Sequence, residues 1–380
     1  MSTRAAAVPP ASHEQPDRAH GDFFAEHLRD RGARYFPQLA GPPGVRLVGW
    51  DDRPFSALYW YELEDGARSV GVFVKVSRHR PPRVRPDRRP TEARPVPSRL
   101  PPEEQFRAES ASLLMAEEHF TGLADPRFGA VRVLTTLPEH RAIVMERLRH
   151  PSLLELTASM RRVPGRWPAP GLERAFGHAG AWLRAYQAAP ATPNLPLARA
   201  DSWLTELRGA VDFLTRSVGH ADLLSRALAT AKERWRSGLV AVPDGPGHGD
   251  FALRNILVAA GDRITVLDIM ARWRAPIYED VGYFVAGLRT TTPQLLGRQI
   301  LANGARIDRY ERAFLRGYSD GDPVPWTAVR LFELRSLLDR WASKSSYPQV
   351  GRLPTVMTLP LINRAFERRV AEVIEELESA

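Results

Sequence analysis

Four polar residues within one short stretch of the chain have the types and spacing needed for phosphoryl transfer. Asp250 lies five residues before Asn255, and His248 stands two residues before Asp250. A further acid, Asp268, sits at the end of an apolar run that begins at Ile264. A carboxylate can accept the proton of a hydroxyl, while an amide and a second carboxylate can hold magnesium against nucleotide phosphates. Such chemistry depends on positioning, so the spacing itself carries information.

The chain contains its own control for this pattern. The tripeptide His-Gly-Asp also occurs at His20 to Asp22, but the fifth residue after Asp22 is His27 and no strand-borne acid follows. The tripeptide alone therefore indicates nothing, because a lone Asp is also a common turn residue and a lone His a common structural one. The full pattern with Asn255 and Asp268 favours a functional reading.

Local signals place the two candidate metal ligands at one end of a hairpin. Residues 255–258 are predicted to form a short strand, Gly261 and Asp262 a turn, and residues 264–268 the returning strand. Asn255 would then enter the first strand where Asp268 leaves the second.

An inner-strand lysine is the next requirement of such a site. Lys75 lies in residues 71–76, where alternating Val, Phe and Val predict a strand. A lysine in an edge strand that points to water is the alternative. A helix predicted to begin near Pro101 supplies Glu109 as its partner, and the competing acids on that helix are Glu103, Glu104 and Glu118.

Residues 248–255, Asp268 and residues 275–285 together resemble the aminoglycoside phosphotransferase family of small-molecule kinases, which also has choline-kinase-like, homoserine-kinase-like and sugar-kinase-like members. The resemblance implies that Asp250 is the catalytic base and that His248 braces its loop. It also implies that Asn255 and Asp268 bind Mg²⁺.

The same resemblance assigns further residues. Asp280 would open the next helix, where a carboxylate can cap backbone N–H groups. Lys75 would hold the nucleotide phosphates, and Glu109 would hold Lys75. Residues 141–148 read as a strand running into an exposed connection, and a simple core strand is the alternative. As a hinge, this segment would place Met145 behind the adenine and the backbone groups of Glu146 and Leu148 at its edge.

The chain departs from the family pattern in two places. The expected phosphate-covering loop, residues 48–57, contains Gly49 as its only glycine, so Ser56 and its backbone would have to bind phosphate. Residues 269–272 replace the aromatic and small residues expected after Asp268.

Composition agrees with a large intracellular enzyme. A chain of 380 residues with 43% hydrophobic content can bury a sizeable core. It has no cysteine, which excludes disulfides, thiolate metal sites and a cysteine nucleophile. No apolar run is long enough to span a membrane and the N-terminus lacks a signal peptide, so we expect a cytoplasmic protein.

A net charge of +9 raises the possibility of nucleic-acid binding. Much of the excess lies in residues 78–94, where dense proline forbids a helix and predicts an extended, solvated insertion. No DNA- or RNA-binding motif accompanies it, so we expect no nucleic-acid partner. A basic nucleic-acid-binding protein with an accidental kinase pattern stays as a rival.

The remaining sequence is mainly helical. Amphipathic patterns predict helices at residues 175–186, 203–214, 221–236, 326–341 and 361–377, and residues 1 to about 20 are expected to be disordered.

We therefore predict an α+β, bilobal, protein-kinase-like fold. It would comprise a tail and leading helix (1–40), a nucleotide-binding N-lobe (41–148) with the insertion at 78–100, and a helical C-lobe (149–380). The predicted reaction moves the γ-phosphoryl group of ATP or GTP to a hydroxyl of a sugar, aminoglycoside or amino alcohol, with a slight preference for weakly charged acceptors. A catalytically silent nucleotide- or partner-binding protein is the alternative. The sequence does not indicate the oligomeric state.

Overall fold

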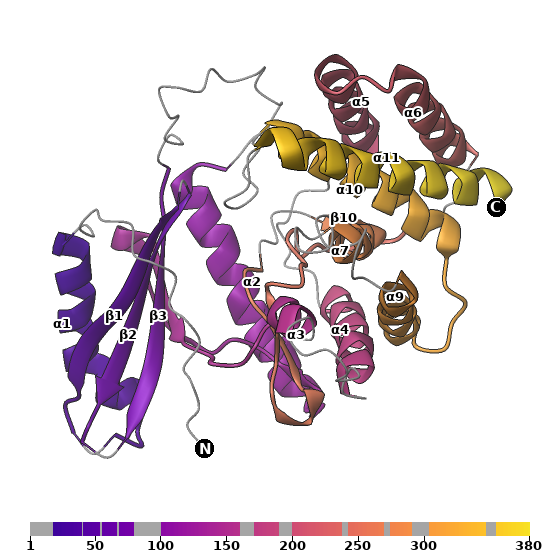
Figure 1. The fold of residues 1–380 in the computed structure, drawn as a ribbon. Coiled ribbons are helices and arrows are strands. Elements are labelled where there is room, and N and C mark those ends of the chain that lie inside the picture. Colours follow the sequence, from indigo (N-terminus) through magenta and orange to yellow (C-terminus); the bar gives the residue numbers. More distant parts are fainter. Residues whose placement is uncertain are drawn as a thin grey trace. The chain divides into compact units, whose positions relative to one another are not determined.

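The computed structural model divides into two compact units (Figure 1). It describes residues 18–39, 41–53, 55–66, 68–79, 100–159, 171–189, 200–237, 242–269, 274–290, 304–346 and 355–380. The first unit holds residues 100–117 and 131–149 with the described part of 1–84, and the second holds residues 118–130 with the described part of 150–380. Three segments with sequence-based expectations lie outside the described residues. They are the N-terminal segment up to residue 17, expected to be disordered, the insertion from residue 80 to 99, and residues 270–273 after Asp268.

The first unit is built on a five-stranded antiparallel sheet with the order β1-β2-β3-β6-β5. Its strands are β1 (Gly44–Arg53), β2 (Ser56–Glu64), β3 (Ser69–Ser77), β5 (Val133–Leu137) and β6 (Ala142–Glu146). The strand predicted around Lys75 is confirmed as β3. Because β3 lies between β2 and β6, the edge-strand alternative is wrong.

The two faces of this sheet have different partners. Helix α1 (Arg18–Tyr35) packs Phe24 and Leu28 into a core that includes Val74 and Val76 of β3. Successive side chains of a strand point to opposite faces, so Lys75 faces away from α1. It meets α2 (Pro102–Leu123), the helix predicted to begin near Pro101.

The second unit is mostly helical, as predicted. Its described helices are α3 (Leu153–Ser159), α4 (Gly171–Gln187), α5 (Ala200–Ser217), α6 (Ala221–Arg236), α7 (Tyr278–Thr290), α9 (Gly304–Ser319), α10 (Trp326–Ser346) and α11 (Thr355–Ser379). Each of the five helices predicted from apolar spacing is confirmed. The α+β fold class is therefore also confirmed, with a small antiparallel sheet in one unit and helices in the other.

Short strands carry the predicted hairpin. Strand β8 (Ile256–Val258) pairs antiparallel with β9 (Ile264–Val266), and β4 (Phe128–Gly129) pairs parallel with β9. The turn between β8 and β9 contains Gly261 and Asp262, whose φ angles are 72° and 59°. In a separate two-stranded sheet, β7 (Asp244–Pro246) pairs with β10 (Arg274–Pro276). Strand β7 leads directly into the loop that contains Asp250.

Glycines allow two close helix crossings in this unit. Between α4 and α9, a Cβ atom on Gly317 would lie 1.9 Å from the carbonyl oxygen of Gly177. Between α7 and α10, a Cβ atom on Gly282 would lie 2.4 Å from the carbonyl carbon of Phe332. Backbones this close exclude any larger side chain at these positions. The second crossing places Tyr283 of α7 against Arg340 of α10.

Candidate active site

Asp280 anchors the loop that contains Asp250. Its carboxylate accepts hydrogen bonds from the backbone N–H of His248 at 2.6 Å and of Gly249 at 2.9 Å. Gly249 has a φ of 79°, a conformation that favours glycine. Asp280 lies in the first turn of α7, as predicted, but the N–H groups that it binds belong to the loop and not to the start of its own helix. Burial raises the pKa of Asp280 to about 7, against the lowering effect of these two hydrogen bonds.

His248 packs beneath the same loop. Its ring is fully buried among Trp182, Tyr186 and Phe251, with ring centroids 6.3, 6.2 and 5.5 Å away. Burial lowers the pKa of His248 to about 4, so the ring is neutral at neutral pH. The Nδ1 atom accepts the backbone N–H of Asp250 at 3.2 Å, which puts the ring proton on Nε2. These contacts are those of a residue that braces the loop.

Asp250 is held by three side chains. A guanidinium nitrogen of Arg254 lies 2.7 Å from Oδ1 and 2.5 Å from Oδ2 of the carboxylate. The amide of Asn255 donates to Oδ2 at 3.0 Å and to the Asp250 carbonyl at 2.9 Å. The hydroxyl of Tyr283 donates to Oδ1 at 2.9 Å. Both carboxylate oxygens are therefore oriented by donors on the loop and on α7.

Asn255 and Asp268 enter and leave the hairpin at the same end, as predicted. Asn255 directly precedes β8, Asp268 follows β9 by two residues, and the backbone N–H of Leu267 donates to the carbonyl of Asn255 at 2.8 Å. Asn255 is 4% exposed, and because its amide nitrogen faces Asp250, its amide oxygen is turned away from that carboxylate. Asp268 has a φ of 55°, a left-handed conformation that turns the chain sharply after the strand.

Lys75 and Glu109 form a buried ion pair in the first unit. The Lys75 ammonium donates to a carboxylate oxygen of Glu109, and the two side chains are 9% and 3% exposed. The competing acids do not take the place of Glu109. Glu103 pairs with the exposed Arg107. Among the described residues, no ion pair joins Glu104 or Glu118 to Lys75.

The remaining predicted residues lie at two places in the first unit. Met145 is buried in β6, opposite Phe73 of β3. The backbone N–H of Glu146 donates to the Arg132 carbonyl at 3.0 Å, so of the two backbone groups of Glu146 only the carbonyl could bind a ligand. Leu148 lies just after the end of β6. Ser56 is buried at the first position of β2, directly after the β1–β2 turn.

Gly49 does not belong to the β1–β2 turn. It lies at a register shift in β1, where a Cβ atom would approach the Trp60 ring to 3.2 Å. From Gly49 onward the two strands pair without interruption up to Arg53 and Ser56. The segment that was expected to cover phosphate is therefore a tight hairpin, and its glycine serves packing.

Sequence reasoning missed Arg254, Tyr283 and Arg340. The Arg340 guanidinium carbon lies 4.1 Å from the centroid of the Tyr283 ring, and one of its nitrogens donates to the Tyr283 carbonyl at 3.2 Å. Arg254 could have been found, because it lies four residues after Asp250 within the motif. No local signal connects Arg340 with Tyr283, since 57 residues separate them.

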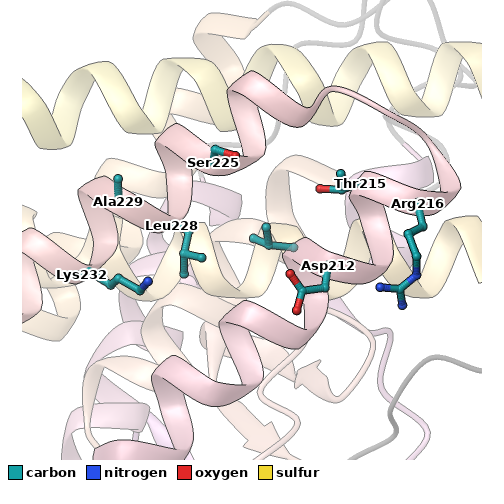
Figure 2. A pocket seen from close by; sticks show the side chains of 8 residues that line it. Asp212, Thr215, Arg216, Ser225, Leu228, Ala229 and Lys232 are labelled. Carbon is teal, nitrogen blue, oxygen red and sulfur yellow. The ribbon is translucent and has the colours of Figure 1, made fainter.

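A surface groove of about 480 Å³ lies between α5 and α6 (Figure 2). Its lining includes Asp212, Arg216 and Lys232 and contains none of the predicted site residues. Among the described residues, no cluster of three or more His, Cys, Asp or Glu side chains could hold a metal by itself. No described helix is long and apolar enough to cross a membrane.

Comparisons with known proteins identify the family. A family model for the phosphotransferase enzyme family (APH) matches residues 130–324, just over half of the chain. No curated protein was found to match.

Solved structures with similar folds span nearly the whole chain. A glucosamine kinase in complex with glucosamine, ADP and inorganic phosphate is 19% identical, with 92% of this chain and 99% of that chain covered and a TM-score of 0.53. A spectinomycin phosphotransferase in complex with ADP and spectinomycin is 10% identical, with coverages of 94% and 98% and a TM-score of 0.51. A choline/ethanolamine kinase family protein from Mesorhizobium loti is 13% identical, with coverages of 92% and 99% and a TM-score of 0.50. At these identities the likeness is one of fold.

Proposed function

We propose a specific reaction and a set of residue roles on one premise: this chain belongs to the phosphotransferase enzyme family and is a small-molecule kinase. The reaction moves the γ-phosphoryl group of ATP or GTP to a hydroxyl of a small molecule. The acceptor oxygen forms a bond to the γ-phosphorus as the bond to the β–γ bridging oxygen breaks. The hydroxyl proton goes to a carboxylate, and a nucleoside diphosphate leaves.

Asp250 is the proposed base. The observation that carries this role is the set of donors around its carboxylate, in which Asn255 and Tyr283 orient one oxygen each. A fixed carboxylate can align a hydroxyl for in-line attack and accept its proton, and such a base typically contributes about 10² to 10⁴ in rate. Asp280 and His248 support this role indirectly, since they hold the loop backbone on both sides of Gly249.

Asn255 and Asp268 are the proposed Mg²⁺ ligands. One amide oxygen and one carboxylate are hard oxygen donors, the kind that Mg²⁺ prefers when phosphate oxygens and water complete its shell. The amide oxygen of Asn255 is suited to this role because the amide nitrogen is already committed to Asp250. Bound Mg²⁺ would neutralise charge on the transferring phosphates.

The first unit provides the proposed donor-binding residues. The Lys75 ammonium, oriented by Glu109, would bind the nucleotide phosphates, and Ser56 would contact them from the start of β2. Met145 would pack against the base. The Glu146 carbonyl and the Leu148 backbone would bind its polar edge.

A catalytically silent nucleotide-binding protein is the second candidate. Two observations favour it: the β1–β2 turn is a tight hairpin, and Arg254 already occupies both oxygens of Asp250. Such a protein would bind nucleotide with magnesium and leave it intact.

A substrate screen separates these candidates. Purified protein would be incubated with magnesium and ATP or GTP against sugars, amino sugars, aminoglycosides, amino alcohols and nucleosides, which include the acceptor classes of the similar structures. Formation of nucleoside diphosphate that depends on both acceptor and Asp250 supports the kinase. Magnesium-dependent nucleotide binding without turnover, across the whole panel, supports the silent protein.

A further inference from the structure

Positive charge gathers around the proposed base. Arg254 contacts both oxygens of Asp250, and Arg340 lies against Tyr283, which contacts the same carboxylate. Lys344 follows Arg340 by one turn of α10. Burial lowers the pKa values of Arg340 and Lys344, and the neighbouring cations, Arg254 for Arg340 and Arg340 for Lys344, lower them further. Like charges are therefore close enough to repel one another here.

Arg340 is the informative member of this group. Its Nε atom is buried and has no hydrogen-bond partner among the described residues. Arg340 contacts the ring and the carbonyl of Tyr283, neither of which carries a formal charge. Burying a cation without a paired anion is costly, so a ligand that brought an anionic group to Arg340 would offset that cost.

Four other buried or partly buried arginines of the second unit are paired with acids. Arg335 pairs with Glu206 and Glu279, and Arg369 pairs with Glu333. Arg330 pairs with Glu311, Glu333 and Glu376, and Arg289 pairs with Asp308 and Glu311. No ion pair in the described part of the chain involves Arg340, and Asp250 is the acid whose charge acts on it.

We propose that the acceptor is an anionic hydroxyl compound, with a phosphate or carboxylate group near its reactive hydroxyl, and that Arg254 and Arg340 bind this group. The proposal rests on the proposed function and names its substrate class. The Arg254 side chain is 52% exposed, so its guanidinium can turn from Asp250 to the acceptor anion. That movement would free the Asp250 carboxylate for the hydroxyl. Polycationic aminoglycosides would meet repulsion at the same place.

The first test uses matched acceptors. Sugars, amino alcohols and nucleosides would each be supplied in neutral, amine-bearing, carboxylate and phosphate-ester forms, with nucleoside diphosphate formation as the readout. We expect the best acceptor to be anionic, with kcat/KM about tenfold or more above that of its neutral counterpart. In Arg340→Met this preference should fall by about tenfold, and Arg340→Lys should restore part of it. A neutral or amine-bearing best acceptor would overturn the proposal. The carboxylate and phosphate arms identify which anion is used.

The second test needs no acceptor. Inorganic phosphate is the probe, with sodium chloride at equal ionic strength as the reference and the shift in melting temperature as the readout. We expect phosphate to stabilise the wild type more than Arg340→Met, while Arg368→Met, whose side chain is 83% exposed, behaves as wild type. Equal stabilisation of all three proteins would contradict the proposal.

Failure of this inference can be told apart from failure of the proposed function. Magnesium-dependent nucleotide turnover that is lost in Asp250→Asn supports the function. If that turnover is present but phosphate binding is unaffected by Arg340→Met, only the anionic acceptor is rejected. If turnover is absent with every acceptor, the function is rejected, while the phosphate experiment still reports on the anion site.

Discussion

The hydroxyl of Tyr283 donates a hydrogen bond to Oδ1 of Asp250 at 2.9 Å. This contact joins the loop after β7 to helix α7, which lies more than thirty residues later in the chain. Burial raises the pKa of Tyr283, so the hydroxyl keeps its proton and acts as a donor. The orientation of the proposed base therefore depends on tertiary packing as well as on its own loop.

Replacing Tyr283 with Phe tests this contact. The variant keeps the ring under Arg340 and removes only the donor, so we expect kcat to fall by about tenfold with little change in nucleotide affinity. Steady-state kinetics would measure both. Tyr61→Phe, which removes a buried hydroxyl from the first unit, is the matched control. An unchanged kcat in Tyr283→Phe would mean that the hydrogen bond does not orient the base.

Asp250→Asn tests the base itself. The side chain keeps its shape and its remaining oxygen can still accept a hydrogen bond, so we expect the fold and nucleotide binding to persist while turnover falls by about 10² to 10⁴ or more. Nucleotide titration and single-turnover assays would measure the two properties. Asp308→Asn, on the exposed side of α9, is the control. Turnover near the wild-type rate would reject the assignment.

The buried pair of Lys75 and Glu109 predicts unequal effects on stability. Glu109→Gln removes the Glu109 charge from the buried Lys75 ammonium and should cost about 3 kcal/mol of unfolding free energy. The double variant Lys75→Met with Glu109→Met should recover most of that loss, because it buries no charge. Denaturant unfolding would measure both. Nucleotide affinity should be lost in every one of these variants, and tight binding by the double variant would contradict the proposed role of Lys75.

His248 predicts a pH dependence of stability. Its pKa is about 4 in the folded protein, against 6.5 in an unfolded chain, so between these values the unfolded state binds more protons. Lowering the pH from about 6.5 to 4 should therefore remove up to about 3 kcal/mol of unfolding free energy through this residue. His248→Gln lacks this titration. The difference between the two pH profiles is the readout, and parallel profiles would contradict the burial of a neutral ring.

The close crossing of α4 and α9 predicts the effect of one methyl group. Gly317→Ala would place a Cβ atom 1.9 Å from the Gly177 carbonyl oxygen, so we expect a loss of about 3 kcal/mol or failure to fold. Gly122→Ala in α2 is the matched control, since a Cβ atom there meets nothing within 4 Å. That control should be neutral or stabilising by up to about 1 kcal/mol. Thermal unfolding of both variants would test the comparison.

Much of the architecture could be predicted because it depends on local patterns. Apolar spacing located the helices, alternation located β3, and the turn at Gly261 located the hairpin that brings Asn255 near Asp268. These signals act within a few residues. The family resemblance favoured Glu109 over its competitors, although only the packing of α2 against β3 brings it to Lys75.

The sequence alone determined the family pattern: a candidate base, two candidate metal ligands and a lysine at the expected positions along the chain. Tertiary structure decided what surrounds them. Asp280 binds the backbone of His248 and Gly249, 32 and 31 residues before it. Arg340 reaches Tyr283 because glycine at position 282 lets α7 and α10 approach closely. Such contacts depend on how separate elements pack, and the spacing of residues along the chain does not predict which elements pack closely. For that reason the charge around the base became visible only in the folded chain.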